Sequence, residues 1–256
     1  PPRCGFAHIA AGKGTPAGMA RDGGARAWAF LRRNPAYREA WRAAFEPPVA
    51  EAAPFSVRIQ SMADRRALAW GLLAWENPRR TDGPATPFWA EAPMLDGEWA
   101  TGAPSLLEFM AGSGTRLEGL RLPDGSLILK FENGSQAVQV RIGPGSEPGI
   151  HKALAVAVRL GQARAIGRLR ELANVAGKPG PHPGRGRSAT DRELLAVLDG
   201  RLAGKSWREV AVQLYGVKRV AAEWDPDSWM RSRVRRLGRR AHGLMQGGYR
   251  DLVAQR

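Results

Sequence analysis

Apolar side chains in the first third of the chain recur three or four positions apart, which is the spacing of an amphipathic helix. Each such stretch stops at or just before a proline, which cannot continue a helix. The pattern predicts helices from about Arg26 to the Asn34-Pro35 pair, from there to Pro47, and from Asp64 to Trp75. The tryptophans at helical spacing are expected to pack in a core, and they are Trp28, Trp41, Trp70 and Trp75.

The spacing of apolar residues then changes from helical to alternating. Three short apolar runs are separated by two turn-forming dipeptides: Leu120–Leu122, Asp124-Gly125, Leu127–Phe131, Asn133-Gly134 and Ala137–Ile142. Both dipeptides favour the positive φ angles of hairpin turns, so the sequence predicts a three-stranded antiparallel meander. An Ala-rich stretch from about Ile150 to Leu172 predicts a long helix after the meander.

Signals for helix starts occur three times in the last third of the chain. Two of them are capping boxes, in which a hydroxyl side chain and a glutamate three residues later each accept a backbone N–H. The three starts are Thr190 with Glu193, Ser206 with Glu209, and Asp227 or Ser228. We therefore predict three helices, the last of which ends at the Gln246-Gly247-Gly248 sequence.

These elements predict an α+β protein of several parts. The segment from Val175 to Arg187 reads VAGKPGPHPGRGR, which has too many prolines and glycines for a helix or a central strand. The predicted parts are a disordered tail at 1–20, a helical module at 21–92, the meander with its long helix at 93–174, a basic linker at 175–187 and a trihelical domain at 188–256.

Positive charge is concentrated at one end of the chain. The formal net charge is +15, with 39 basic and 24 acidic side chains. Residues 1–150 contribute only +2 of it, and residues 151–256 contribute +13. A preference for Arg over Lys in the coding sequence does not explain this asymmetry. It is typical of a nucleic-acid-binding module joined to a near-neutral one.

The third of the C-terminal helices carries the densest charge. Its apolar residues recur at steps of four and three and define one face: Met230, Val234, Leu237, Ala241 and Leu244. Six arginines occupy the rest of its circumference: Arg231, Arg233, Arg235, Arg236, Arg239 and Arg240. No acidic residue lies between Ser228 and Arg250, so no partner four residues away neutralises them. Unpaired guanidinium groups repel one another, and a polyanion against this face would offset that cost.

A helix, a short helix and a basic helix follow one another in a helix-turn-helix unit, whose last helix enters the major groove of DNA. The planar fork of arginine suits this role because it can bond two phosphate oxygens or the O6 and N7 atoms of guanine. The connection at Val217–Pro226 exceeds the usual turn of about 3–4 residues, so we expect a variant geometry or an insertion. Further candidate DNA contacts are Lys205, Arg208, Arg185 and Arg187, the last two as a minor-groove arm.

The strings GKSWREVAVQLYG (204–216) and SRVRRLGRRAHGLMQGGYRDLV (232–253) resemble the DNA-binding domain of RovC-like transcription factors. That proteobacterial family includes regulators of type VI secretion and activators and antiactivators of conjugative-element excision. The N-terminal string AWAFLRRNPAYREAW (27–41) resembles the small transcriptional-regulator-like domain that accompanies it. The resemblance implies a non-enzymatic regulator, an activator, that reads duplex DNA through the arginines of its last long helix. It also implies RNA polymerase or another regulator as a partner.

Other readings of the same residues stay open. The Arg face could be solvated, or could bind RNA or an acidic protein, and some relatives act as antiactivators that sequester another regulator. A nucleic-acid-processing enzyme would need Glu223, Asp225 and Asp227 to bind a metal, although acids before a helix are also expected from capping and the helix dipole. The segment from Gly200 to Ser206 resembles a phosphate-binding loop but has three residues between its glycines where that motif needs four.

Several classes of protein are not expected. The single cysteine, Cys4, excludes an internal disulfide or a cysteine-ligated metal site, and the four histidines are scattered. No apolar run reaches about 18 residues, so no membrane span is predicted. The first twenty residues lack the pattern of a signal peptide. We expect a cytoplasmic protein with no cofactor, with duplex DNA as its partner and with a homo-oligomer as an option.

Overall fold

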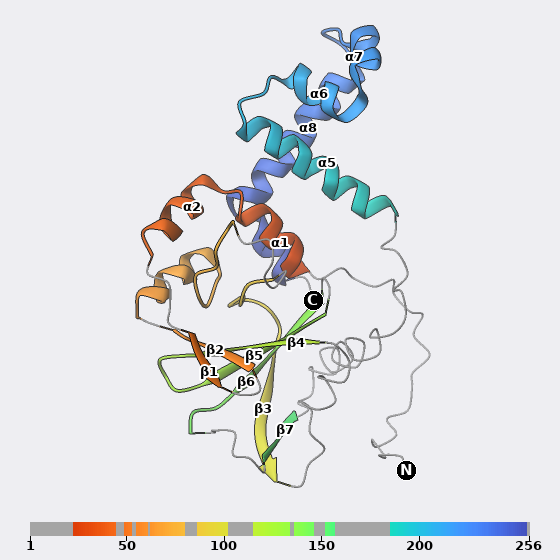
Figure 1. Ribbon diagram of the computed structural model, residues 1–256. Helices are drawn as coiled ribbons and strands as arrows, with labels where there is room; N and C mark the ends of the chain where they lie inside the picture. Colours follow the sequence, from red (N-terminus) through yellow and green to blue (C-terminus); the bar gives the residue numbers. More distant parts are fainter. Residues whose placement is uncertain are drawn as a thin grey trace, which may run out of the picture.

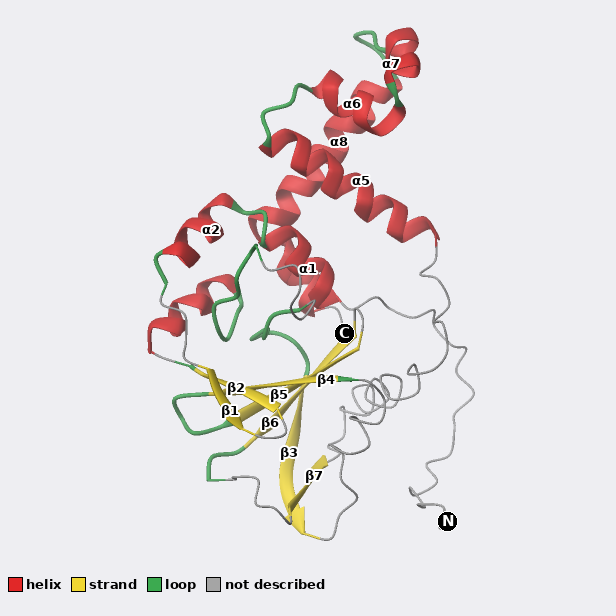
Figure 2. Cartoon of the chain, in the orientation of Figure 1, coloured by secondary structure: helices red, strands yellow, loops and turns green. Residues whose placement is uncertain are grey.

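The computed structural model of the chain describes residues 23–44, 49–52, 55–60, 62–79, 86–101, 115–133, 136–145, 152–156 and 185–254. The predicted tail at 1–20 lies outside these ranges. The described residues form the predicted α+β fold. A sheet and a cluster of helices lie at opposite ends of the molecule, with the two N-terminal helices between them (Figure 1), and Figure 2 shows the same view coloured by secondary structure.

The first two predicted helices are confirmed as α1 (Gly23–Leu31) and α2 (Pro35–Arg42). Asn34 joins them. Its side-chain oxygen accepts a hydrogen bond from the Ala36 N–H at 2.9 Å, which caps α2. Pro35 takes the first helical position, where a helix needs no N–H donor. The break predicted at this pair is therefore a tight corner between two packed helices.

The third predicted helix is wrong in type and length. Met62–Trp70 form a 3-10 helix, η1, and the chain then turns at Gly71, whose φ is 71°, instead of continuing to Trp75. Beyond the turn the Leu73 N–H donates to the Phe88 carbonyl at 2.8 Å. This tertiary pairing holds the segment extended, where the spacing of apolar residues alone predicted another helical turn.

The strands form one seven-stranded mixed sheet. They are β1 (Val49–Ala52), β2 (Phe55–Ile59), β3 (Met94–Thr101), β4 (Arg116–Arg121), β5 (Leu127–Asn133), β6 (Gln136–Ile142) and β7 (Lys152–Val156), in the order β1-β2-β4-β5-β6-β3-β7. The antiparallel pairs β4–β5 and β5–β6 confirm the predicted meander. Its first turn holds Gly125 at a φ of 81°. β2 and β3 extend the meander on its two sides, each parallel to its neighbour in it.

Strand β7 contradicts the start of the predicted Ala-rich helix. Lys152–Val156 pair antiparallel with β3, with Trp99 opposite Leu154. Alanine is a good helix former, but β3 offers an unpaired edge whose backbone groups need partners, and propensity yields to such tertiary context. The rest of that predicted helix lies outside the described residues.

Polar side chains of the meander hold the 86–89 segment against the sheet. Lys130 is 1% exposed, with its Nζ 3.1 Å from the carboxylate of Glu118 on the neighbouring strand. The same ammonium donates to the Thr86 carbonyl at 2.6 Å. One strand further, the Gln139 amide accepts from the Trp89 N–H at 3.1 Å and donates to the Trp89 carbonyl at 2.9 Å. The buried polar ends of Lys130 and Gln139 are thus paired, as removal from water requires.

The described residues from 185 onward form helices joined by short turns. The elements are α5 (Arg185–Leu202), α6 (Trp207–Tyr215), α7 (Val217–Glu223), α8 (Trp229–Gly243), the π-helix η2 (Leu244–Gly248) and α9 (Tyr249–Ala254). The three predicted helices are present as α5, α6 and α8. The long predicted connection is largely α7, and the predicted end of the last helix is a π turn that leads into α9.

The predicted start of α5 is wrong. The helix begins at Arg185, inside the predicted linker, so Thr190 is not its N-cap. Glycine lowers helix stability by only about 1 kcal/mol, so a helix anchored by its buried second half can extend back through Gly186 to Arg185.

One apolar core joins the two ends of the sequence. It combines buried residues of α1 with buried residues of α5, α6, α8 and α9, and with Trp75 and Trp89 from the middle of the chain. Tyr249 of α9 packs on Trp89 with ring centroids 6.0 Å apart. The Asn34 amide donates to the Met245 carbonyl at 3.1 Å. The N-terminal helices are therefore packed onto the C-terminal helices through a shared interior.

Candidate nucleic-acid interface

Helix α8 begins at a side-chain cap and buries one face. The Ser228 hydroxyl accepts a hydrogen bond from the Met230 N–H at 3.2 Å, in agreement with the predicted start. The apolar positions predicted from spacing point inward, and Met230, Val234 and Ala241 are fully buried. Leu244, the last of them, belongs to η2 and is partly buried. Burial of this stripe fixes which side of α8 faces solvent.

A glycine lets α6 pack closely on α8. A Cβ atom at Gly238 would lie 2.6 Å from the ring of Trp207, closer than real Cβ atoms approach a neighbour. The Trp207 ring thus rests directly on the backbone of α8. The guanidinium of Arg201 lies 4.4 Å from the centroid of the same ring, which is a cation–π contact. Close packing of these helices holds the exposed face of α8 in a fixed orientation.

The exposed face of α8 carries arginines without partners. Arg235, Arg236, Arg239 and Arg240 are exposed and Arg231 is half-buried, and none of the five side chains has a hydrogen bond or ion pair within the described part of the chain. At 100° per residue, Arg235, Arg236 and Arg239 lie opposite the buried stripe, with Arg231 and Arg240 to either side. The structure therefore brings five of the six predicted arginines onto one solvent-facing surface, which we call the α8 arginine face.

Arg233 is the exception, and the expectation that none of the six is neutralised is wrong for it. Its guanidinium donates to the Glu193 carboxylate of α5 at 3.0 Å. This hydrogen bond, together with the nearby Tyr215, raises the pKa of Arg233 above its usual value. Glu193 lies forty residues earlier, so a search for partners within α8 could not find it.

The other predicted contacts lie on two different helices. Lys205 and Arg208 are exposed at the start of α6, where Ser206 and Glu209 form the predicted capping box. The Lys205 ammonium reaches the Gln213 side chain at 3.3 Å, whereas the Arg208 side chain has no partner within the described residues. Arg185 and Arg187 lie in the first turn of α5, and their side chains are outside the described part of the structure.

An aromatic cluster at the start of α8 was not predicted. Trp229 is 49% exposed, and its ring packs edge-on against Tyr215 with centroids 5.8 Å apart. Its Nε1 donates to the Glu223 carboxylate at 3.2 Å, and the Arg219 guanidinium lies 5.3 Å from its ring. The only signal in the sequence was the position of Trp229 directly after the helix cap. The cluster places a rigid aromatic edge beside the α8 arginine face.

The acidic residues before α8 are used within the fold. The Asp225 carboxylate accepts from the Asp227 N–H at 2.9 Å, and Glu223 pairs with Arg219 at 3.1 Å. Across the described residues no three His, Cys, Asp or Glu side chains gather in a group that could hold a metal ion. In the same residues no helix is both long enough and apolar enough to cross a lipid bilayer.

Comparison with known proteins addresses this part of the chain. Residues 151–254 match the RovC DNA-binding domain, described as the DNA-binding domain of a transcription factor of the type VI secretion system. This region is similar to that family. The match covers α5 to α9 and β7, so the RovC-type region includes the whole α8 arginine face. A search of curated proteins found no match to the chain. The resemblance of the N-terminal helices to a regulator-like domain stays a prediction.

Proposed function

We propose that the protein is a transcription regulator that binds duplex DNA through the α8 arginine face. The observation that carries the proposal is a row of exposed guanidinium groups without partners, on a helix whose orientation is fixed by burial of its other side. The match of residues 151–254 to the RovC DNA-binding domain supports DNA as the polyanion. RNA or an acidic protein could bind the same arginines, but the family match does not support either of them.

The geometry favours base contacts for some of the arginines and phosphate contacts for others. Contacts from arginine to phosphate oxygens supply most of the affinity of such interfaces, and bidentate contacts to guanine supply sequence discrimination. Arg235 and Arg239 lie one turn apart near the centre of the exposed face, so we assign them to base contacts. Arg231 and Arg240 flank them and suit phosphates. Arg208, at the start of α6, is placed to bind a further phosphate.

The arrangement is a variant of the helix-turn-helix. Helices α6 and α8 take the places of its two helices, and α7 fills the connection that is a short turn in the standard unit. The exposed ring of Trp229, at the N-terminus of α8, would lie next to the groove. We propose that its edge contacts the sugar-phosphate backbone where α8 enters.

The test measures the affinity of the full chain for duplex DNA by fluorescence anisotropy over a range of salt concentrations. Neutralisation of about five phosphates predicts a slope of log K against log salt of about −4 to −5. The double variant Arg235→Ala/Arg239→Ala should weaken binding at least tenfold, and Arg116→Ala is the matched control. Arg116 is an exposed arginine on strand β4, without a partner among the described residues. Equal affinity of the wild type and the double variant would refute the assignment.

We propose further that the regulated genes are those of a secretion system or a conjugative element, and that the chain acts as an activator through RNA polymerase or another regulator. This step rests on the family description and on the resemblance of the N-terminal helices. Sequencing of genomic fragments that the protein retains would identify the genes. Fragments without any common sequence would argue against a specific regulator.

One observation favours a second candidate, an antiactivator that sequesters another regulator. The segment from β2 to η1 exposes large apolar side chains, with Ile59 42%, Met62 66% and Leu68 45% exposed. Large apolar side chains left exposed within one short segment are a feature of protein interfaces. Replacement of Met62 and Leu68 by Ser would abolish capture of a partner regulator in this case and leave DNA binding intact.

A further inference from the structure

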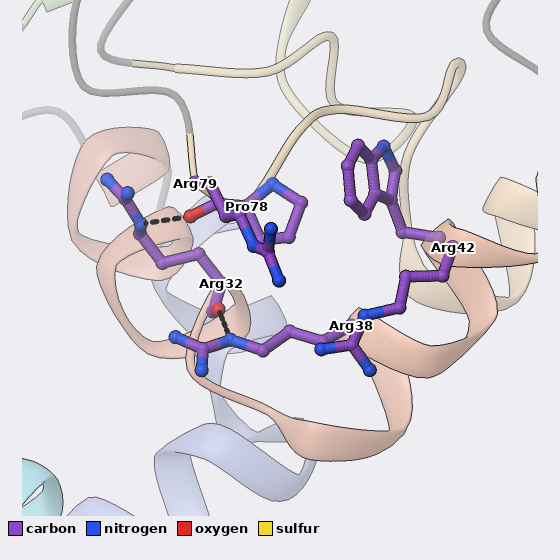
Figure 3. A pocket seen from close by; sticks show the side chains of 6 residues that line it. Arg32, Arg38, Arg42, Pro78 and Arg79 are labelled. Carbon is purple, nitrogen blue, oxygen red and sulfur yellow. Dashed lines mark hydrogen bonds between the residues drawn. The ribbon is translucent and has the colours of Figure 1, made fainter.

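A pocket between the N-terminal helices and the chain after η1 is lined by four arginines. Its volume is about 330 Å³, and its lining consists of Arg32, Arg38, Trp41, Arg42, Pro78 and Arg79. Figure 3 shows Arg32 and Arg79 on one side of the hollow, with Arg38 and Arg42 from α2 on the other. No acidic residue belongs to this lining. The pocket is part of the near-neutral half of the chain and is separate in sequence from the α8 arginine face.

Backbone carbonyls hold two of the four guanidinium groups in place. Arg32 donates from Nε to the Pro78 carbonyl at 3.0 Å, and Arg38 donates from Nε to the Arg32 carbonyl at 2.8 Å (Figure 3). In both side chains only Nε forms a hydrogen bond, so the two terminal nitrogens keep their N–H donors for another acceptor. The side chains of Arg42 and Arg79 have no partner within the described residues.

Among the described residues no acidic side chain forms an ion pair with the four arginines of the pocket, although Glu39 lies on α2 between Arg38 and Arg42. Arg33, beside Arg32, is paired with Asp199, and the nearby Glu76 is paired with Arg58. Burial lowers the pKa of Arg32, and the positive charges of Arg33 and Arg38 lower it further. Four guanidinium groups around one hollow therefore repel one another unless an anion lies between them.

The shape of the site favours a small ligand with several negative charges close together. Phosphates of a DNA strand are spread along a convex backbone, about 3.4 Å of helix axis apart, and a recessed pocket reaches few of them. A diphosphate or triphosphate concentrates its charge within one pocket and offers the paired oxygens that arginine forks bind. Trp41, half-buried in the wall, adds an aromatic surface on which a base can stack.

We propose that this pocket binds a nucleoside diphosphate or triphosphate, with its phosphates held by Arg32, Arg38, Arg42 and Arg79 and its base against Trp41. The site is formed by α1, α2 and the 78–79 segment, and α1 and α2 pack into the core that they share with the C-terminal helices. The proposal does not depend on the proposed function, because it concerns different residues and a different ligand.

The test is isothermal titration calorimetry of the full chain with ATP, GTP, tripolyphosphate and inorganic phosphate at constant ionic strength. We expect a nucleoside triphosphate to bind with one site per chain and inorganic phosphate to bind at least tenfold more weakly. Absence of heat with all four probes would overturn the proposal. Equal affinity for tripolyphosphate and for the nucleotides would overturn the assignment of the base to Trp41.

Variants separate this pocket from the α8 arginine face. Arg38→Gln/Arg79→Gln should lower nucleotide affinity at least tenfold, because both side chains are exposed and their replacement leaves no buried group unpaired. Arg116→Gln is the matched control, and circular dichroism checks that each variant is folded. Arg235→Ala/Arg239→Ala should bind the nucleotide as the wild type does. Loss of nucleotide binding in that variant, with the pocket variant unaffected, would place the ligand on the DNA-binding surface and overturn the proposal.

Discussion

The guanidinium of Arg33 donates two hydrogen bonds to the carboxylate of Asp199, at 2.6 and 3.0 Å. The pair joins the turn directly after α1 to α5 across 166 residues of sequence. A second pair, Arg26 with Asp191 at 2.8 Å, joins α1 itself to α5. Two ion pairs therefore fix the orientation of α1 against the first helix of the C-terminal cluster.

We expect a small coupling energy between Arg33 and Asp199 because the aspartate is half exposed. A double-mutant cycle with Arg33→Ala and Asp199→Ala, in which urea denaturation measures stability, should give a coupling energy of about 0.5–1 kcal/mol at low salt. The coupling should decrease when the salt concentration rises, since ions screen exposed charges. A coupling that stays constant up to high salt would contradict this account.

Gly238→Ala should destabilise the C-terminal helices. The new methyl group would meet the Trp207 ring at 2.6 Å, and such overpacking costs about 1–3 kcal/mol. Gly243→Ala is the matched control on the same helix, because nothing lies within 4 Å of a Cβ there. That control should leave the free energy of unfolding unchanged or raise it, since alanine favours the helix by about 1 kcal/mol. A similar loss in both variants would rule out the contact with Trp207 as the cause.

Glu132 should make the stability of the sheet depend on pH. Burial raises the pKa of its carboxyl, although Lys130 and the hydrogen bonds from Thr86 oppose the shift. The folded state then binds the proton more tightly than the unfolded state, so the charged form weakens folding at neutral pH. The free energy of unfolding of the wild type relative to Glu132→Gln should rise as the pH falls through the raised pKa. At pH values below the ordinary pKa of glutamate this gain in the free energy of unfolding should be complete. Denaturation of both proteins at several pH values measures it. A difference that is independent of pH would show that the pKa of Glu132 is not raised.

Arg233 and Arg240 should differ in their effect on DNA binding. Arg240→Ala removes an exposed cation that we assign to a phosphate, so the slope of log K against log salt should decrease in magnitude by about 1. Arg233→Ala breaks the ion pair with Glu193 instead and should leave that slope nearly unchanged while it lowers the melting temperature. Equal changes of slope in both variants would mean that Arg233 also contacts phosphate.

The sequence predicted the elements that depend only on residues close to one another along the chain. The Asp124-Gly125 turn, the Ser206 capping box and the apolar stripe of α8 each depend on residues only a few positions apart. The meander, the start of α6 and the buried side of α8 were therefore predictable. The five arginines of the α8 arginine face followed directly from the position of that stripe.

Distant contacts explain what the sequence did not predict. β7 is a strand because β3, more than fifty residues earlier, presents an edge to it. Arg233 is neutralised by Glu193 on another helix. The arginine pocket is assembled from residues 32–42 and 78–79, whose proximity follows only from the packing of η1 and the N-terminal helices. No spacing rule within one segment could have revealed these three relationships.

The core that α1 shares with α9 has a consequence for synthesis on the ribosome. The sheet lies between these helices in the sequence, so its strands emerge long before α9 does. Trp28 and Phe30 of α1 belong to a core that is completed only by helices made after the sheet. Until α8 and α9 have been made, the apolar side chains of the N-terminal helices lack part of their cover, and binding of a chaperone at this stage would protect them from aggregation.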